Sequence, residues 1–412
     1  MKNKQFLFSF LLVTLLISAI FNSCKKDEEP EPLTLVSLVA GTIDLNAAIS
    51  ATDIPLDPTI TATFSVDVDP ATATETNITL IQDYDDVSIA LNITVDAKVI
   101  TITPTSDLGT GTLYKLDFST GLKSTDGVAL TELERNFTTT GAFSPSGAIA
   151  HFNFEDNADD QIGSFDPLAA DIIDITYTAS RKTAAGKAAT FNGTTSIIEV
   201  PNGDDLMNTA DFSIAFWVKT NSADKTGGHF VMGCAGWFGF QYEIYGSYDG
   251  AKFAFQYELA DNSTASEDMW FPSLADLGWQ GWTYAKSLTV AEMTALLKDN
   301  WLNVVYTYNG STKVGTLYYN GEKMKSLDFN LWPDDDAKKG VIGLKYNGTE
   351  LGDNLAFGFI QGRNNRTISD TWADYSHADA TNHFKGQLDD IKIWHKVISA
   401  NEIMLMYNSE KP

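Results

Sequence analysis

Large aromatic side chains crowd into the segment between positions 260 and 300. Five of them fall within 15 positions, separated by polar residues and glycine: Trp270, Phe271, Trp279, Trp282 and Tyr284. Their spacing fits neither a strand nor a helix, so we expect them on loops. Flat apolar faces with a polar handle suit the C–H faces of sugar rings, and loops on a rigid scaffold are common binding platforms. The alternative is that they form a local hydrophobic core that closes one end of the fold, because large aromatics are mostly buried.

A second candidate surface comes from a predicted β-hairpin at residues 238–259. A two-residue turn at Asp249-Gly250 would put the apolar side chains of both strands on one face and the polar ones on the other. In that register Ile244 faces Phe255 and Glu243 faces Gln256. We expect the apolar face on a core and the polar face toward solvent. The polar face would present these side chains: Trp237, Gln241, Glu243, Tyr245 and Gln256.

Oxygen ligands gather at residues 155–163, EDNADDQIG, where five acidic or amide groups occupy six positions. Calcium takes about six to eight oxygen ligands, so Asp156, Asn157 and Asp160 are candidate metal ligands. The alternative is a solvated acidic turn, which is common in so acidic a chain. A further polar segment, QGRNNRT at 361–367, is interpreted as a turn rather than a binding loop.

No catalytic constellation is apparent. Glycoside hydrolysis needs two positioned carboxylates, and the adjacent Asp389 and Asp390 should point to opposite faces of a strand. Cys234 lies in an apolar stretch, and none of the five histidines stands in a recognisable motif, so we expect a buried thiol rather than a nucleophile. We therefore expect a protein that is not an enzyme.

The N-terminus has the three parts of a secretory signal: Lys2 and Lys4, an apolar run, and small or polar residues before Cys24. Residues 24–32, CKKDEEPEP, predict an extended tether, because proline and repelling acids keep a chain open. IFNSC resembles a bacterial lipobox, and KKDEE resembles the export signal of Bacteroidota surface lipoproteins. These resemblances imply a signal peptide at 1–23, lipidation of Cys24, and an outer-membrane anchor with the protein facing the medium.

Composition limits the partners of this chain of 412 residues. A formal net charge of −26 repels nucleic acid and anionic lipid surfaces, so contact with a membrane is expected through the lipid anchor only. The same charge is compatible with neutral glycans and with cations. It counts against strongly anionic polysaccharides unless calcium bridges them.

Short alternating strands separated by turn residues dominate positions 33–141 and predict a β-sandwich. In ITATFSVDVD, for example, Ile60, Ala62 and Phe64 share one face. The segments PLDPTITATFSVDVDPAT, YKLDFSTGLKSTDG and NFTTTG resemble a bacterial Ig-like domain, which implies a spacer without functional residues of its own.

The remainder, residues 146–412, also predicts an all-β fold. Strands are expected at 212–220 and in a hairpin at 303–324, and one helix is expected at 287–300 with Ser287 or Thr289 as its cap. Two stacked antiparallel sheets suggest a jelly roll. The segments AIAHFNFEDNADDQIGSFD, AATFNGTTSIIEVPN, DFSIAFWVKT and FKGQLDDIKIWHKVISANEIMLMYN resemble the laminin-G-like, concanavalin A-like lectin family. Residues 260–300 depart from that pattern as an insertion.

This second resemblance implies a structural calcium ion between the opening loop and the closing strand. The matching positions are Asp160 and Asp389, with Asp156, Asn157 and Asp390 as nearby alternates. The E-x-D-x-x-E run of laminarinase-type hydrolases is missing. We therefore expect non-catalytic capture of a polysaccharide or oligosaccharide, with an outer-membrane glycan transporter as a candidate partner. The alternatives are an adhesion or assembly protein that binds another protein, and a divergent glycosidase or lyase. The residues expected to contact the glycan are Trp237, Gln241, Glu243, Tyr245, Trp270, Trp279, Trp282 and Tyr284.

Overall fold

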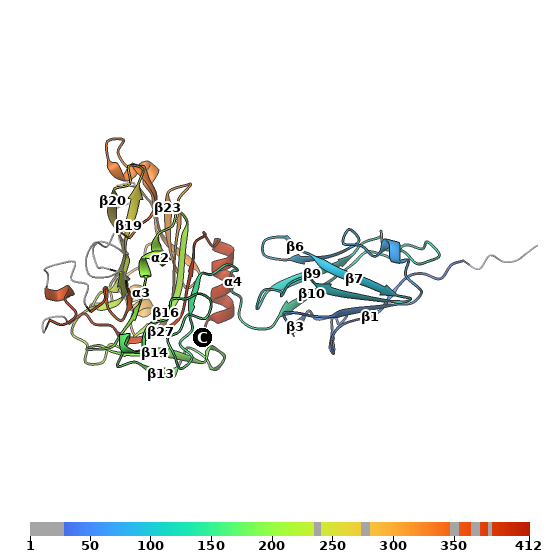
Figure 1. Ribbon diagram of the computed structural model, residues 1–412, viewed down its shortest axis with the longest axis horizontal. Helices are drawn as coiled ribbons and strands as arrows, with labels where there is room; N and C mark the ends of the chain where they lie inside the picture. The colour runs from blue at the N-terminus through green and yellow to red at the C-terminus, as the bar shows by residue number, and fades with distance from the viewer. Residues whose placement is uncertain (1–28, 235–239, 273–280, 347–353, 364–370, 378–380) are drawn as a thin grey trace, which may run out of the picture. The chain divides into compact units, whose positions relative to one another are not determined.

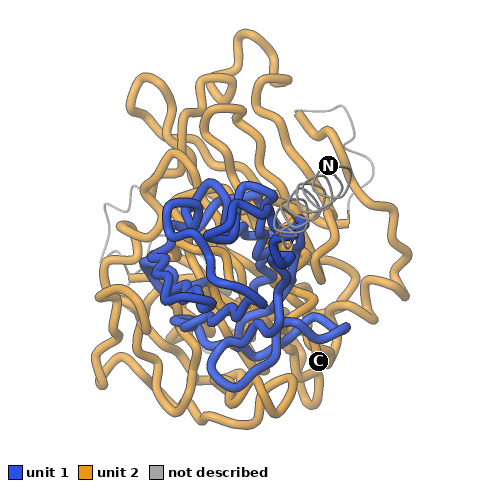
Figure 2. Tube along the Cα trace, turned by 90° about the vertical axis from the view of Figure 1, so that its right-hand side faces the viewer, with its two compact units in different colours: residues 1–108, 112–140 blue, residues 109–111, 141–412 orange. Residues whose placement is uncertain are grey.

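The computed structural model describes residues 29–234, 240–272, 281–346, 354–363, 371–377 and 381–412. The chain divides into two compact units: unit 1 holds residues 1–108 and 112–140, and unit 2 holds residues 109–111 and 141–412 (Figure 2). The predicted signal peptide and Cys24 lie outside the described residues. Among the helices of the described ranges, none has both the length and the apolar composition needed to cross a bilayer.

Unit 1 is a sandwich of two five-stranded sheets (Figure 1). One sheet has the order β2-β1-β4-β8-β7: β1 (Leu35–Ala40), β2 (Ile43–Asp44), β4 (Ile60–Phe64), β7 (Leu91–Asp96) and β8 (Val99–Pro104). The other has the order β3-β10-β9-β5-β6: β3 (Ala51–Ile54), β5 (Ile78–Gln82), β6 (Val87–Ile89), β9 (Leu113–Phe118) and β10 (Leu133–Thr139). Ile60, Ala62 and Phe64 are buried as their alternation predicts, and they join the unit's own hydrophobic core.

Unit 2 is a larger sandwich of two antiparallel sheets. The first, named the β27 sheet, has the order β13-β14-β27-β16-β22-β23-β24-β21, with β11 also paired to β27. Its strands are β11 (Ala150–Phe152), β13 (Thr176–Ala179), β14 (Lys187–Asn192), β16 (Phe212–Thr220), β21 (Trp282–Ala285), β22 (Trp301–Asn309), β23 (Val314–Tyr319), β24 (Glu322–Asp328) and β27 (Lys385–Trp394). The predicted strand at 212–220 and the predicted hairpin at 303–324 are confirmed as β16 and β22–β23–β24.

The second sheet of unit 2, named the β19 sheet, has the order β12-β15-β26-β17-β18-β19-β20, with β25 also paired to β19. Its strands are β12 (Ile172–Ile173), β15 (Ile197–Val200), β17 (His229–Cys234), β18 (Phe240–Ile244), β19 (Ala251–Leu259), β20 (Thr264–Phe271), β25 (Val341–Leu344) and β26 (Leu355–Phe357). Aromatic side chains from both sheets fill the space between them, and Phe255 stacks on Tyr306 with ring centroids 4.0 Å apart. The predicted jelly-roll sandwich is confirmed, and Cys234 is buried in its core.

The predicted helix at 287–300 is confirmed as α3 (Val290–Leu297), which begins with a capping box between Thr289 and Glu292. Expecting a single helix was wrong. A short helix, α2 (Gly203–Met207), and a longer C-terminal helix, α4 (Ala400–Glu410), are also present. Ser399 and Glu402 form the capping box of α4, and Ile403 and Met406 are buried. The sequence carried that signal in S-x-x-E.

The predicted register of the 238–259 hairpin was wrong by four residues. Ile244 pairs with Ala251 and Glu243 with Lys252, because the chain closes a wider loop in which the N–H of Tyr245 donates to the carbonyl of Gly250. Since four is an even number, each side chain keeps its predicted face. The polar face is not freely solvated, however: Gln241, Lys252 and Gln256 are buried.

Candidate functional site

The acidic loop that predicted a calcium site is held by its own backbone. Both carboxylate oxygens of Asp160 accept main-chain N–H groups: Oδ1 from His151 and Ile162 at 2.9 and 3.1 Å, and Oδ2 from Gly163 and Phe165 at 3.0 and 3.4 Å. Asp156 pairs with the Lys187 ammonium at 2.5 Å, and Oδ1 of Asn157 accepts the N–H of Asp159. The Asp156 carboxylate is therefore paired with a lysine of β14, and the Asn157 amide stabilises the loop itself.

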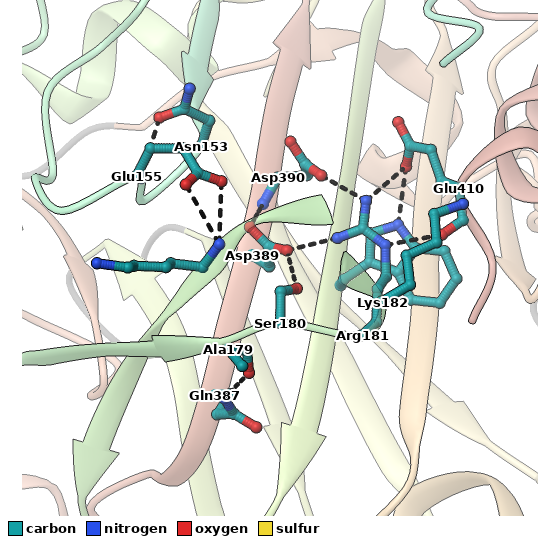
Figure 3. Close-up of polar contacts among 12 residues, drawn as sticks. Asn153, Glu155, Ala179, Ser180, Arg181, Lys182, Gln387, Asp389, Asp390 and Glu410 are labelled. Atoms are coloured by element: carbon teal, nitrogen blue, oxygen red, sulfur yellow. Dashed lines mark hydrogen bonds and ion pairs between the residues drawn. The ribbon is translucent and has the colours of Figure 1, made fainter. Parts of the chain in front are cut away.

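Asp389 and Asp390 lie in a different group of contacts. The expectation that they point to opposite faces of β27 was wrong. Between the pairs Ala215–Lys392 and Trp217–Asp389, β27 carries one residue more than β16, which is a β-bulge. Asp390 at this bulge has a positive φ of 45°. The bulge turns both carboxylates toward Arg181, which reaches Asp389 through Nη1 and Asp390 through Nη2, each at 2.5 Å (Figure 3).

Helix α4 completes this buried charge cluster, as Figure 3 shows, because Arg181 lies between the two aspartates and Glu410. The carboxylate of Glu410 accepts the indole N–H of Trp217 and pairs with the Lys392 ammonium, both at 2.8 Å. Its main-chain carbonyl accepts Nε–H of Arg181. Sequence reasoning missed Arg181, Lys392 and Glu410, because their partners come from distant parts of the chain.

The cluster holds three carboxylates against the two fixed cations Arg181 and Lys392. Burial and the neighbouring Asp390 raise the pKa of Asp389 to about 8, although Arg181 acts in the opposite direction. Burial opposes ionisation of Asp390 too, but the hydrogen bond with His151 and the charges of Lys392 and Arg181 hold its pKa well below its usual range. With all three carboxylates ionised, the cluster would carry one excess negative charge. Protonation of Asp389 removes this excess, in agreement with its raised pKa.

These residues do not fit a calcium ion. Asp160 and Asp389 have separate sets of partners, and the oxygens of Asp389 already accept from Arg181, Ser180 and the N–H of Asp390. Among the described residues, no group of three or more His, Cys, Asp or Glu side chains is placed to hold a metal.

The aromatic residues predicted to form loops lie partly on strands. Trp270 and Phe271 belong to β20, and Trp282 and Tyr284 belong to β21 on the other sheet. Trp270 is 46% exposed and Tyr284 is 38% exposed, whereas Trp282 is only 3% exposed and joins the core. Trp237 and Trp279 lie outside the described residues.

The structure brings Trp270 to the polar face of the predicted hairpin, because Lys252 of β19 pairs with Trp270 of β20. The ring centroids of Tyr245 and Trp270 are 5.9 Å apart. The Lys252 ammonium lies 5.1 Å from the Trp270 ring centroid, 3.5 Å from Glu243 and 3.4 Å from Asp268. We call the group formed by Glu243, Tyr245, Lys252, Asp268 and Trp270 the Trp270 face.

A small pocket adjoins this face. It has a volume of about 260 Å³, and Glu243, Tyr245 and Asn382 line it together with the main chain of Gly228 and Gly246. The amide oxygen of Asn382 accepts the N–H of Gly228 at 2.8 Å, which fixes one wall. Carboxylate, amide and aromatic groups thus meet at one opening, and these are the groups that orient polar ligands with apolar faces. Gln241, also predicted to contact a glycan, is buried.

Two buried lysines hold Trp270 in place. Lys252 lies beside its ring, and Lys325 of β24 donates from Nζ to its carbonyl oxygen at 2.8 Å while lying 3.9 Å from the ring centroid of Trp282. Burying an ammonium group is unfavourable unless it is paired. The two buried ammonium groups therefore fix the position of Trp270, although its side chain is half-exposed.

Comparison with known families agrees with this architecture. Residues 42–139 match the family described as bacterial Ig-like domain, and residues 192–357 match the family described as concanavalin A-like lectin/glucanases superfamily. Both predictions of domain type are confirmed. No curated protein matches the chain.

Solved structures with a similar fold come from several binding domains. The binding domain of Paraclostridial Mosquitocidal Protein 1 is 15% identical, with a TM-score of 0.40 over 64% of this chain and 52% of that one. The Botulinum Neurotoxin Type G receptor binding domain is 14% identical, with a TM-score of 0.36 over 64% and 51%. This chain thus spans about half the length of these two structures.

A third similar structure is domain 4 of AbnA, a GH43 extracellular arabinanase from Geobacillus stearothermophilus, in complex with arabinotriose. It is 17% identical, with a TM-score of 0.36 over 63% of this chain and 98% of that one. At these identities the likeness concerns the fold alone.

Proposed function

We propose that this chain, in which a bacterial Ig-like domain precedes a concanavalin A-like domain, captures a saccharide on the Trp270 face. The observation that carries the proposal is the exposed indole of Trp270 beside Tyr245, supported by two buried lysines. An aromatic plane offers an apolar surface to the C–H face of a sugar ring. Glu243 and Asn382 in the adjoining pocket supply an acceptor and an amide for its hydroxyl groups.

Display at the cell surface completes the proposal. Lipidated Cys24 anchors the chain in the outer membrane, residues 24–32 act as a tether, and the Ig-like domain is a spacer. The captured saccharide is a polysaccharide or oligosaccharide from the medium, and an outer-membrane glycan transporter is its recipient. Calcium forms no part of this proposal, because the predicted ligands are engaged elsewhere.

Affinity gel electrophoresis of residues 25–412 against a polysaccharide panel tests the proposal. We expect at least one glycan to retard the protein, and the variant Trp270→Ala to lose most of that retardation. The loss in affinity should be roughly fivefold to 150-fold, because one stacked aromatic contributes about 1–3 kcal/mol. Tyr284→Ala is the matched control, since Tyr284 is a similarly exposed aromatic on the other sheet.

Each outcome of this experiment is informative. Equal losses in both variants would assign the effect to general destabilisation rather than to the Trp270 face. Retardation that Trp270→Ala leaves intact would place the saccharide elsewhere. No retardation by any glycan would contradict the proposal and favour adhesion to a protein partner.

Cleavage of the bound saccharide is a second candidate function, and one observation favours it. Burial raises the pKa of Glu243, against the opposing charge of Lys252, and Asp268 contacts the same ammonium. A carboxylic acid with a raised pKa beside a second carboxylate is what glycoside hydrolysis requires. Release of reducing ends from the retarded glycan, lost in Glu243→Gln, would establish cleavage. Retardation without such release supports capture alone.

A further inference from the structure

The charged side chains of the Trp270 face differ in their exposure to solvent. Lys252 is deeply buried, with only 3% of its side chain exposed, whereas Glu243 and Asp268 expose 14% and 25% of theirs. The three strands that form the face, β18 to β20, contain Lys252 as their single basic residue and four acidic residues. A ligand on this face therefore meets carboxylate oxygens, with the ammonium beneath them.

Two neighbouring lysines, Lys345 and Lys338, do not alter this balance. Lys345 contacts Glu258 at 2.6 Å, and Lys338 contacts Glu267 at 2.5 Å, so each is paired with its own carboxylate. Around Tyr245, by contrast, Glu243, Asp268 and Asp249 all act with burial, the largest cause, to raise the pKa of its hydroxyl. The face itself holds two carboxylates, Glu243 and Asp268, against the ammonium of Lys252. When Asp249 beside Tyr245 and the Lys325 ammonium at the Trp270 carbonyl are included, three carboxylates meet two ammonium groups, which leaves one excess negative charge.

We propose that Glu243 and Asp268 select the ligand by charge, so that the Trp270 face accepts uncharged saccharide chains and rejects uronate and sulfated ones. This inference rests on the proposed function. A carboxylate accepts hydrogen bonds from sugar hydroxyl groups at no electrostatic penalty. An anionic group at the same place would lie against like charges in a partly desolvated site, where repulsion is poorly screened.

Matched polysaccharide pairs test the inference on residues 25–412. Each pair shares a backbone and differs in charge: hydroxyethyl and carboxymethyl cellulose, dextran and dextran sulfate, and methyl-esterified and de-esterified polygalacturonan. For any pair with a bound member, we expect the neutral member to bind at least about tenfold more tightly at low salt. Raising the salt concentration should reduce this difference in affinity, because the anionic polysaccharide should bind more tightly while the affinity for the neutral one stays constant.

The variant Asp268→Asn should bind the anionic polysaccharide more tightly than the unmodified chain does at low salt. The difference in affinity between the neutral and anionic members of a pair should therefore be smaller. The matched control is Glu322→Gln, which also removes a carboxylate paired with a lysine, at an exposed site on the β27 sheet. It should leave the ratio unchanged. If the anionic member binds as tightly as the neutral one in the unmodified chain, charge selection is wrong although saccharide capture stands. If neither member of any pair binds, the proposed function fails and the inference falls with it.

Discussion

Asp389 illustrates how single residues depend on partners that are far apart in the chain. It faces Arg181 and Ser180 from the turn after β13, and its neighbour Asp390 contacts His151 of β11. Burial and Asp390 raise the pKa of Asp389 to about 8, so the folded state holds a proton that the unfolded state releases near pH 4. The stability given by this proton is complete below pH 4 and is lost as the pH rises toward 8.

The variant Asp389→Asn tests this linkage, because asparagine is uncharged at every pH. Relative to the unmodified chain, its free energy of unfolding should rise by on the order of 1 kcal/mol per pH unit between pH 5 and 8. Urea denaturation at four pH values would measure the slope, with the exposed Asp335→Asn as control. A constant difference across this range would mean that Asp389 is ionised throughout in the folded state.

Sequence reasoning found Trp270, Glu243 and Tyr245 but assigned them to two surfaces. Alternation predicted which side chains share a face of β18 and β19, and that survives an even shift of register. The pairing of β19 with β20, which unites the two surfaces, is a long-range contact that no local pattern encodes. Lys252 was missed for the same reason: an alternating polar residue predicts exposure, whereas two carboxylates from neighbouring strands allow this lysine to be buried.

At the scale of elements, hydrogen bonds between buried tyrosines join the two sheets of unit 2. The hydroxyl groups of Tyr242 on β18 and Tyr319 on β23 are 3.0 Å apart, and those of Tyr257 and Tyr306 are 2.9 Å apart. Each single Tyr→Phe substitution removes one partner and leaves the other hydroxyl buried, at roughly 1–3 kcal/mol.

A double-mutant cycle on Tyr242 and Tyr319 should therefore be strongly non-additive. Tyr242→Phe and Tyr319→Phe together should lower the free energy of unfolding by less than the sum of the two single variants. The reason is that the double variant leaves no buried hydroxyl without its hydrogen-bond partner. Urea denaturation of the four proteins gives the coupling energy. Additive losses would show that each hydroxyl finds another partner when the first is removed.

The two capping boxes allow a comparison of helices with different roles. Ser399 caps α4, whose last residue, Glu410, enters the buried charge cluster, and Thr289 caps α3. Ser399→Ala and Thr289→Ala should each cost about 1 kcal/mol. Hydrogen exchange should rise in α4 for the first and in α3 for the second. Exchange that rises in both helices with either change would mean that they open together.

The sequence predicted α3 but not α4, although both begin with the same kind of cap. The residues of α4 fall within the segment that was matched as a whole to the closing strand of the lectin family. Their helical pattern was therefore not considered separately. The physical difference is tertiary: α4 is held by Trp217, which stacks on Tyr407 and donates to Glu410. Such contacts come from β16, almost two hundred residues earlier.

At the scale of the whole molecule, the two units have separate hydrophobic cores. Phe118 belongs to the core of unit 1, and Phe216 belongs to the core of unit 2. A core that draws residues from only one unit should unfold with that unit. We therefore expect two transitions when residues 25–412 are heated in a calorimeter.

Core truncations would assign these transitions. Phe118→Ala and Phe216→Ala should each cost about 3–5 kcal/mol, because each deletes a buried ring and leaves a cavity. The first should lower one melting temperature and the second should lower the other. Saccharide binding, which we place on unit 2, should persist at temperatures between the two transitions only if unit 1 melts first. A single transition that both variants lower equally would show that the units unfold as one cooperative structure, and the Ig-like domain would then contribute to the stability of the binding domain as well as to its display.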